Sequence, residues 1–276
     1  HGYEISVDAN KSFAGGSWIS ARFNMTYATG KYDVYEEPDY GYEWLSWEGK
    51  RLNQITGLIA ERLFIDEADI ANSPTQMFGN VMPGDIKYKD INEDGIINSQ
   101  DYVPIGYPTI PNYIYGFGFS AGFKGFDFSC FFQAATECSF RINYEKTAPF
   151  VNNGQWGSVT ANAMLTEWAD NRWTESNRDC YAMYPRLTPQ IVSNNNKSST
   201  WWLRDGSYLR LKTLEFGYTI PKKACQAMRM KTFRIYFSGT NLFTLSKFKM
   251  WDVEMSDNGL NYPIQRVFNL GLNVNF

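Results

Sequence analysis

Strict alternation of apolar and polar side chains over residues 267–276 is the feature that most limits how this chain can fold. Every even position there is apolar, and asparagine fills most of the odd positions. The apolar residues are Phe268, Leu270, Leu272, Val274 and Phe276. Successive side chains of a β-strand point to opposite faces, so this segment has one apolar face and one polar face. A strand that lies between lipid and a wet lumen has this pattern.

The same alternation recurs along the chain. It is found over 3–10, 19–27, 113–123, 126–133 and 233–238. The dipeptide Lys124-Gly125 predicts a tight hairpin turn. Within 208–220 the apolar phase slips, which predicts a β-bulge near Lys212-Thr213. With a weaker strand expected over 53–64, the chain has roughly eight strands, most near the 9–11 residues that cross a bilayer at a tilt.

A soluble β-sandwich also alternates, but its outward face usually carries charged and β-branched polar residues. Here the polar positions are mainly glycine, serine, asparagine and arginine, and aromatic residues gather toward the ends of the predicted strands. No run approaches the roughly 20 apolar residues of a membrane helix. We therefore predict an all-β fold, an antiparallel transmembrane β-barrel or a portion of one.

The predicted connections differ greatly in length. Those at 124–125 and 220–223 are short, whereas those at 30–51, 65–111 and 139–206 are long. Because outer-membrane barrels have short periplasmic turns and long outer loops, we expect the long connections to be extracellular. Loop 139–206 includes a short predicted helix over 161–170. Its tryptophans Trp156, Trp173, Trp201 and Trp202 could stack on sugar rings, or could pack the loop onto itself.

Residues 90–101, here called the ion loop, have the spacing of an EF-hand-type calcium loop. Oxygen donors fall at loop positions 1, 3, 5, 9 and 12, a glycine lies at position 6, and position 7 would offer its backbone carbonyl. The predicted ligands are Asp90, Asn92, Asp94, Ile96, Asn98 and Asp101. Asp101 replaces the usual glutamate, as in dockerin loops. Because 84–89 is strand-like, we expect structural Ca²⁺, or alternatively Mg²⁺; an ion-free turn is the competing interpretation.

Several functions are not expected from the composition. A net charge of -3 without a basic cluster argues against a nucleic-acid partner. His1 is the only histidine, which argues against catalytic triads and histidine-rich metal sites. The four cysteines fit no zinc or redox spacing. The chain opens without a start methionine or signal peptide, so we expect a mature or truncated piece.

Short sequence motifs distributed along the whole chain resemble the carboxyl-terminal part of SusC/RagA-type TonB-dependent outer-membrane transporters. They lie at 83–95, 125–128, 172–174, 184–187, 205–212, 216–221 and 238–244, followed by the closing Phe276. One departure is Val253 between Asp252 and Glu254, where the family often has proline.

The resemblance implies a full-length barrel of about 22 strands with a plug domain inside it. Residues 1–276 would be the carboxyl-terminal portion of that barrel, and the plug domain would be absent from this chain. It implies TonB-dependent import of a glycan (oligosaccharide) or peptide across the Gram-negative outer membrane, without covalent chemistry. A SusD-like surface lipoprotein would act as the lid, and the TonB complex would act through the absent amino-terminal part. Phe276 would be the terminal aromatic that the outer-membrane insertion machinery reads.

On this interpretation the lumen face carries polar strand residues, and loop 139–206 meets the lid or the cargo. The lumen residues are Arg22, Asn24, Arg234, Asn269 and Asn273, and of these Arg22 and Arg234 are expected to bind cargo. The first and last strands would pair with strands outside this chain, because lipid offers no hydrogen-bond partner for the backbone N–H and C=O groups of an open sheet edge. The alternative function is a soluble calcium-dependent carbohydrate-binding β-domain. A glycosidase would need two facing carboxylates, and no enzyme is expected.

Overall fold

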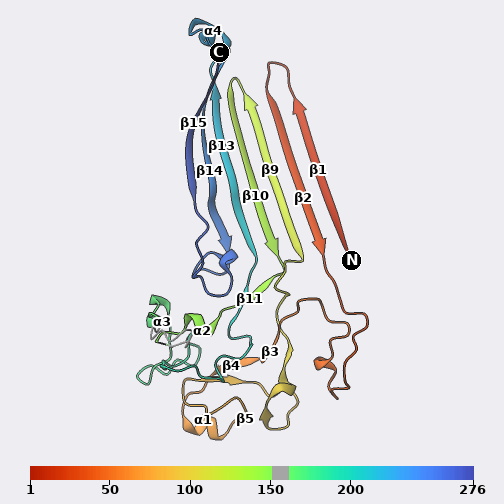
Figure 1. Ribbon diagram of the computed structural model, residues 1–276, viewed down its shortest axis with the longest axis vertical. Coiled ribbons are helices and arrows are strands. Elements are labelled where there is room, and N and C mark those ends of the chain that lie inside the picture. Colours follow the sequence, from red (N-terminus) through yellow and green to blue (C-terminus); the bar gives the residue numbers. More distant parts are fainter. Residues whose placement is uncertain (151–161) are drawn as a thin grey trace, which may run out of the picture.

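The computed structural model describes residues 1–150 and 162–276, and a seven-stranded antiparallel sheet is its largest element (Figure 1). In spatial order its strands are β1 (Gly2–Ser12), β2 (Trp18–Ala28), β9 (Tyr113–Phe123), β10 (Phe126–Thr136), β13 (Tyr208–Thr219), β14 (Thr232–Ser246) and β15 (Val267–Asn275). Each contains a segment that alternation had identified, so the predicted all-β antiparallel fold is confirmed. Among the described residues, no helix is both long enough and apolar enough to span a membrane.

Two local predictions about the sheet are also confirmed. Lys124 and Gly125, between β9 and β10, have φ angles of 49° and 90°, the left-handed conformation that a two-residue hairpin turn requires. The register of β13 against β14 shifts between Leu211 and Thr213. The bulge therefore lies where the apolar phase slips in the sequence.

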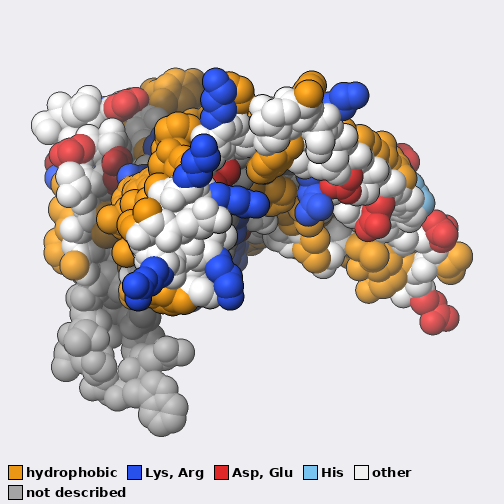
Figure 2. All heavy atoms as spheres, turned by 90° about the horizontal axis from the view of Figure 1, so that it is seen from above, with side chains coloured by type: hydrophobic (Ala, Val, Ile, Leu, Met, Phe, Trp, Pro, Cys, Tyr) orange, Lys and Arg blue, Asp and Glu red, His pale blue; other side chains and the backbone are white. Residues whose placement is uncertain are grey.

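Cross-strand register extends the alternation across the whole sheet and gives it two distinct faces. Phe237 of β14 lies opposite Phe216 of β13 and Leu270 of β15, and Phe23 of β2 lies opposite Phe117 of β9. We call this side the apolar face and the other side the polar face. Leu270 is 79% exposed, so no described residue of this chain covers that part of the apolar face. Seen from the α4 end, the sheet forms an arc (Figure 2).

Glycines on the polar face lie beneath large side chains of the neighbouring strands. A Cβ atom added at Gly122 would lie 2.1 Å from the indole Nε1 of Trp18, its pairing partner on β2. A Cβ atom at Gly271 would lie 2.3 Å from the ring of Tyr236, its partner on β14. Glycine at these positions lets a ring lie against the backbone of the next strand.

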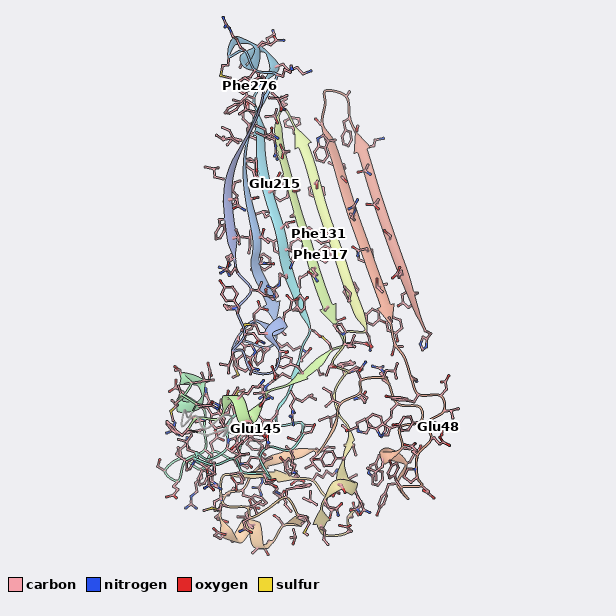
Figure 3. The ribbon with its side chains drawn as sticks, viewed as in Figure 1. Glu48, Phe117, Phe131, Glu145, Glu215 and Phe276 are labelled. Carbon is pink, nitrogen blue, oxygen red and sulfur yellow. The ribbon has the colours of Figure 1, made fainter. Side chains whose placement is uncertain are left out.

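The long connections gather at one end of the sheet (Figure 1). We call the described residues of 29–112, 137–207 and 247–266 the loop body. Its elements are η1 (Glu43–Leu45), β3 (Thr56–Gly57), β4 (Ala60–Leu63), α1 (Glu67–Ala71), β5 (Thr75–Gln76), β6 (Ile86–Tyr88), β7 (Ile96–Ile97), η2 (Ser99–Asp101), β8 (Val103–Pro104), β11 (Ser139–Arg141), α2 (Tyr144–Thr147), α3 (Thr166–Asp170), β12 (Leu203–Asp205) and η4 (Val253–Met255). Glu48 and Glu145 lie in it, whereas Phe276 lies at the opposite end of the sheet (Figure 3).

The loop body has its own hydrophobic core, made by segments that are far apart in the sequence. Buried members include Leu58, Leu63, Ile86, Tyr88, Ile142, Tyr144, Trp168, Tyr184 and Trp202. Trp168 stacks on Tyr184 with ring centroids 4.0 Å apart. Burial of these apolar side chains stabilises the loop body.

Three expectations about the connections are corrected by the structure. Residues 53–64 do not form a strand of the main sheet, which has seven strands rather than about eight; they form β3 and β4, which find local partners in β8 and β6. The link between β13 and β14 is longer than a four-residue turn, because α4 (Lys222–Ala227) begins directly after Pro221. The helix expected over 161–170 begins only at Thr166, and residue 161 lies outside the described residues.

Candidate functional site

The polar face carries arginines that are paired with carboxylates of neighbouring strands. Arg234 of β14 donates from Nε to Asp127 of β10 at 3.1 Å and from Nη2 to Glu215 of β13 at 2.6 Å. Arg22 of β2 lies 2.6 Å from Asp8 of β1. The two arginines predicted for the lumen therefore lie on the polar face, but each is held in a charge pair. Arg234 is held between two carboxylates, whereas Arg22 is in one largely exposed pair, with side chains 68% and 49% exposed.

A small cavity opens where the polar face meets the loop body. Its volume is about 270 Å³, and Gln133, Tyr208 and Glu254 are among the residues that line it. Tyr208 donates its hydroxyl hydrogen bond to Glu254 at 2.9 Å. The fully buried Arg210 lies 2.7 Å from Asp252 and 2.8 Å from Glu254. This charge cluster fixes η4 over the end of the sheet, so the cavity has a rigid polar wall.

Sequence reasoning missed this cavity. In the sequence, Asp252 and Glu254 are notable only because valine separates them where the family often has proline. No local pattern pairs them with Arg210, which is 42 residues away from Asp252. A buried arginine needs carboxylate partners. The alternation of β13 could have shown that Arg210 shares the polar face with Tyr208.

Two of the predicted cargo-binding tryptophans are core residues. Trp173 and Trp202 are both buried in the core of the loop body, and the indole of Trp202 donates to the Asn195 carbonyl at 2.6 Å. Of the two alternatives, these two residues therefore favour packing of the loop onto itself, because ordering a long chain segment requires buried apolar surface. Trp201 is half-buried and donates to the Met183 carbonyl at 3.0 Å. Trp156 lies outside the described residues.

A buried carboxylate joins distant segments of the loop body. Asp85 is fully buried and accepts hydrogen bonds from Asn195 Nδ2 and from the Met82 backbone N–H, each at 2.9 Å. The guanidinium of Arg186 lies 2.9 Å from the same carboxylate. Burial raises the pKa of Asp85, against the opposing effect of Arg186. The carboxylate thus connects the turn before β6 to chain more than a hundred residues later.

A second ion pair makes part of the loop body sensitive to acid. Arg62 donates two hydrogen bonds to Asp69 on α1, at 2.5 and 2.8 Å. These bonds are the main cause that lowers the pKa of Asp69 to about 2. Because the pKa is lower in the folded protein than in the unfolded chain, the pair's contribution to stability is complete above about pH 4. That contribution is lost as the pH falls toward about 2.

We therefore expect pepsin cleavage near α1 to increase as the pH is lowered from about 4 to about 2. In the Asp69→Asn variant, cleavage near α1 should already be fast at pH 4 and should change less over this range. Peptide mapping of digests across the range measures both effects. A pH dependence in the variant equal to that of the unmodified protein would contradict the assignment.

The ion loop turns as its spacing predicts. Gly95 has a left-handed φ of 84°, and its N–H donates to Asp90 at 2.8 Å. Asp101 is fully buried and accepts from the N–H groups of Ile91 and Asn98, at 2.8 and 2.7 Å. Backbone N–H groups therefore occupy carboxylate lone pairs in this loop.

The carboxylates of the ion loop do not converge on a common point. Asp94 accepts from the Ile96 N–H at 2.7 Å and from Asn92 Nδ2 at 3.0 Å. Across residues 1–150 and 162–276, no group of three or more histidine, cysteine, aspartate or glutamate side chains is placed to hold a metal ion. The three aspartates of the described loop thus form no such group, and calcium binding stays a prediction.

Chelation tests that prediction directly. If calcium holds the ion loop, a calcium chelator should increase protease cleavage within 84–104 in the full-length protein that contains this chain. The Asp94→Ala variant should be cleaved there with or without chelator, while the strands stay protected. Cleavage of the unmodified protein that does not respond to the chelator would show that the loop is held by its own hydrogen bonds.

Comparison with known proteins places the chain among much longer ones. No family model matches it. It is 34% identical over 206 residues to TonB-dependent receptor P26 of Formosa agariphila, covering 70% of this chain and 20% of the relative. It is 31% identical over 212 residues to TonB-dependent receptor P3 of the same organism, covering 72% of this chain and 20% of the relative. The chain therefore spans about a fifth of the length of these relatives.

Solved structures share the fold. The structure of the RagAB peptide transporter matches with a TM-score of 0.69 and 20% sequence identity, over all of this chain and 29% of that chain. The RagAB peptide importer in its open-open state matches with a TM-score of 0.65 and 19% identity, over all of this chain and 28% of that chain. The sheet and the loop body together thus correspond to a segment of a larger fold.

Proposed function

The chain belongs to the TonB-dependent receptor family of outer-membrane β-barrel proteins, and we propose that it forms part of the wall and outer surface of an importer. One observation supports this most: seven strands expose an apolar face opposite a polar face, and the loop body lies at one end. An apolar face opposite a polar face is typical of strands that lie between lipid and a wet lumen. The polar face then lines the lumen, the loop body is extracellular, and α4 is periplasmic.

The cargo that we propose is an oligosaccharide or a peptide. The resemblance to SusC-type transporters favours a glycan, whereas the solved relatives are named for peptide transport. With Trp173 and Trp202 in the core, tryptophan content no longer favours sugars. The cavity beside Tyr208 and Glu254 offers both hydrogen-bonding and apolar walls, which suit the end of either kind of oligomer.

The importer would act with partners that lie outside this chain. We propose that a SusD-like lipoprotein covers the extracellular loop body, and that the TonB complex supplies energy through the amino-terminal part of the full-length protein. We also propose that β1 and β15 pair with other strands of that protein, because a sheet edge cannot face lipid unpaired. The role is transport without covalent chemistry.

Uptake by living cells tests this function. A strain that lacks the full-length gene should lose accumulation of one class from defined, labelled mixtures of oligosaccharides and peptides. Reintroducing the gene should restore accumulation, and removal of TonB or collapse of the proton gradient should abolish it again. Unchanged accumulation of both classes in the deletion strain would overturn the proposal. A full-length protein that stays in solution without detergent would favour the soluble binding domain.

A further inference from the structure

The apolar face contains a groove next to the loop body. It has a volume of about 570 Å³ and crosses β2, β9, β10, β13 and β14. These strands all lie between β1 and β15 in the sheet, so the floor and the walls of the groove are complete within this chain.

A small residue forms the floor of the groove, and larger apolar residues form its walls. Ala134 of β10 pairs with Tyr115 of β9 on one side and Leu209 of β13 on the other. Phe117 stacks on Phe132 with ring centroids 5.1 Å apart. Alanine beside these larger side chains leaves an open groove in the apolar face next to the loop body. Its mainly apolar lining can make dispersion contacts with a hydrocarbon chain.

The end of the groove beside the loop body is positively charged. Lys247 and Lys249 line it together with Asp205. The Lys247 side chain is 85% exposed, and its Nζ lies 3.1 Å from the Asp205 carboxylate. The Ser207 and Ser246 hydroxyls lie in the same lining. Two cations and one carboxylate leave an excess positive charge where the strands would leave the hydrocarbon.

We propose that this groove binds a phosphorylated lipid of the outer leaflet. One acyl chain lies over Ala134, and the phosphate meets Lys247 and Lys249. Long lysine side chains reach the headgroup level while their stems stay beside hydrocarbon. An anionic headgroup complements the excess positive charge, and a neutral one does not. The proposal rests on the membrane orientation given under Proposed function, and it concerns the outer wall rather than the cargo path.

Lipid binding by the full-length receptor tests the proposal. The probes are monophosphoryl lipid A and the same lipid after removal of its phosphate, each titrated into detergent-solubilised receptor and counted by native mass spectrometry. We expect the phosphorylated lipid to bind more tightly. The double variant Lys247→Ala, Lys249→Ala should weaken its binding by about fivefold or more and should leave the dephosphorylated lipid unaffected.

Two further variants separate the parts of the groove. Ala134→Phe fills the floor and should weaken binding of both lipids. Lys124→Ala is the matched control, because Lys124 lies over the Phe123 ring at the opposite end of the strands; it should bind as the unmodified receptor does. Equal binding of the two lipids, or unchanged binding by the double lysine variant, would overturn the proposal. Cargo uptake by the lysine variants reports separately on the proposed function.

Discussion

Replacing Leu270 with arginine is expected to destabilise the membrane-inserted sheet by about 2–4 kcal/mol. Leu270 lies near the middle of β15, on the apolar face, and is highly exposed there. A guanidinium at that depth would face hydrocarbon without water or a counter-charge. Asn269 is the matched control, because it is adjacent in sequence but points to the polar face. Asn269→Arg should be tolerated.

Unfolding in urea of the full-length protein, inserted in lipid vesicles, measures the difference. The folded barrel is followed by its resistance to denaturation in detergent at room temperature. Leu270→Arg should lower the urea midpoint and reduce the amount of protein in the outer-membrane fraction, and Asn269→Arg should do neither. If the two variants behaved alike, the assignment of the two faces would be wrong.

Replacing Asp85 with alanine is expected to unfold the loop body and leave the sheet in place. The substitution removes the buried partner of the Arg186 guanidinium and the acceptor for Asn195 and the Met82 N–H. Breaking a buried charge pair on one side costs about 3–5 kcal/mol, and we expect a loss toward the lower end, because the Arg186 side chain is 20% exposed. Asp33 is exposed, so Asp33→Ala should change little.

Protease treatment of intact cells detects this result, because the loop body is expected to face outward. Asp85→Ala should make sites within 58–97 and 162–204 cleavable. The strands should keep their resistance to denaturation in detergent. A cleavage pattern like that of the unmodified protein would show that the buried carboxylate is dispensable, and simultaneous loss of the sheet would show that the two parts do not fold separately.

The strands could be predicted from the sequence because one local rule determines them. A residue that faces lipid is apolar, so the residue type at each strand position predicts whether that position lies on the lipid-facing side. The bulge between Leu211 and Thr213 could be predicted for the same reason, since an extra residue shifts the phase of the pattern. The loop body follows no such rule. Its core brings together residues such as Leu58 and Trp202, and their contact depends on the path of the chain between them.

The candidate site was only partly predictable. Alternation places Arg234 on the polar face, but its partners Asp127 and Glu215 are 107 and 19 residues away and are selected by strand register. In the ion loop, residue types predict the turn at Gly95 but not the direction of each carboxylate. A tryptophan that packs a loop and one that stacks on a ligand have the same local sequence, which is why the sequence leaves both roles open for Trp202.

The rings that cover glycines on the polar face solve a problem that alternation leaves open. Moving one strand by two residues against its neighbour restores the apolar and polar faces, so hydrophobicity alone does not distinguish the correct alignment from that error. Trp18 over Gly122 and Tyr236 over Gly271 do distinguish it. After a two-residue displacement, each ring would meet a position that carries a side chain, such as Ser120 or Asn273. These pairs would therefore favour the correct register when neighbouring strands pair during barrel assembly.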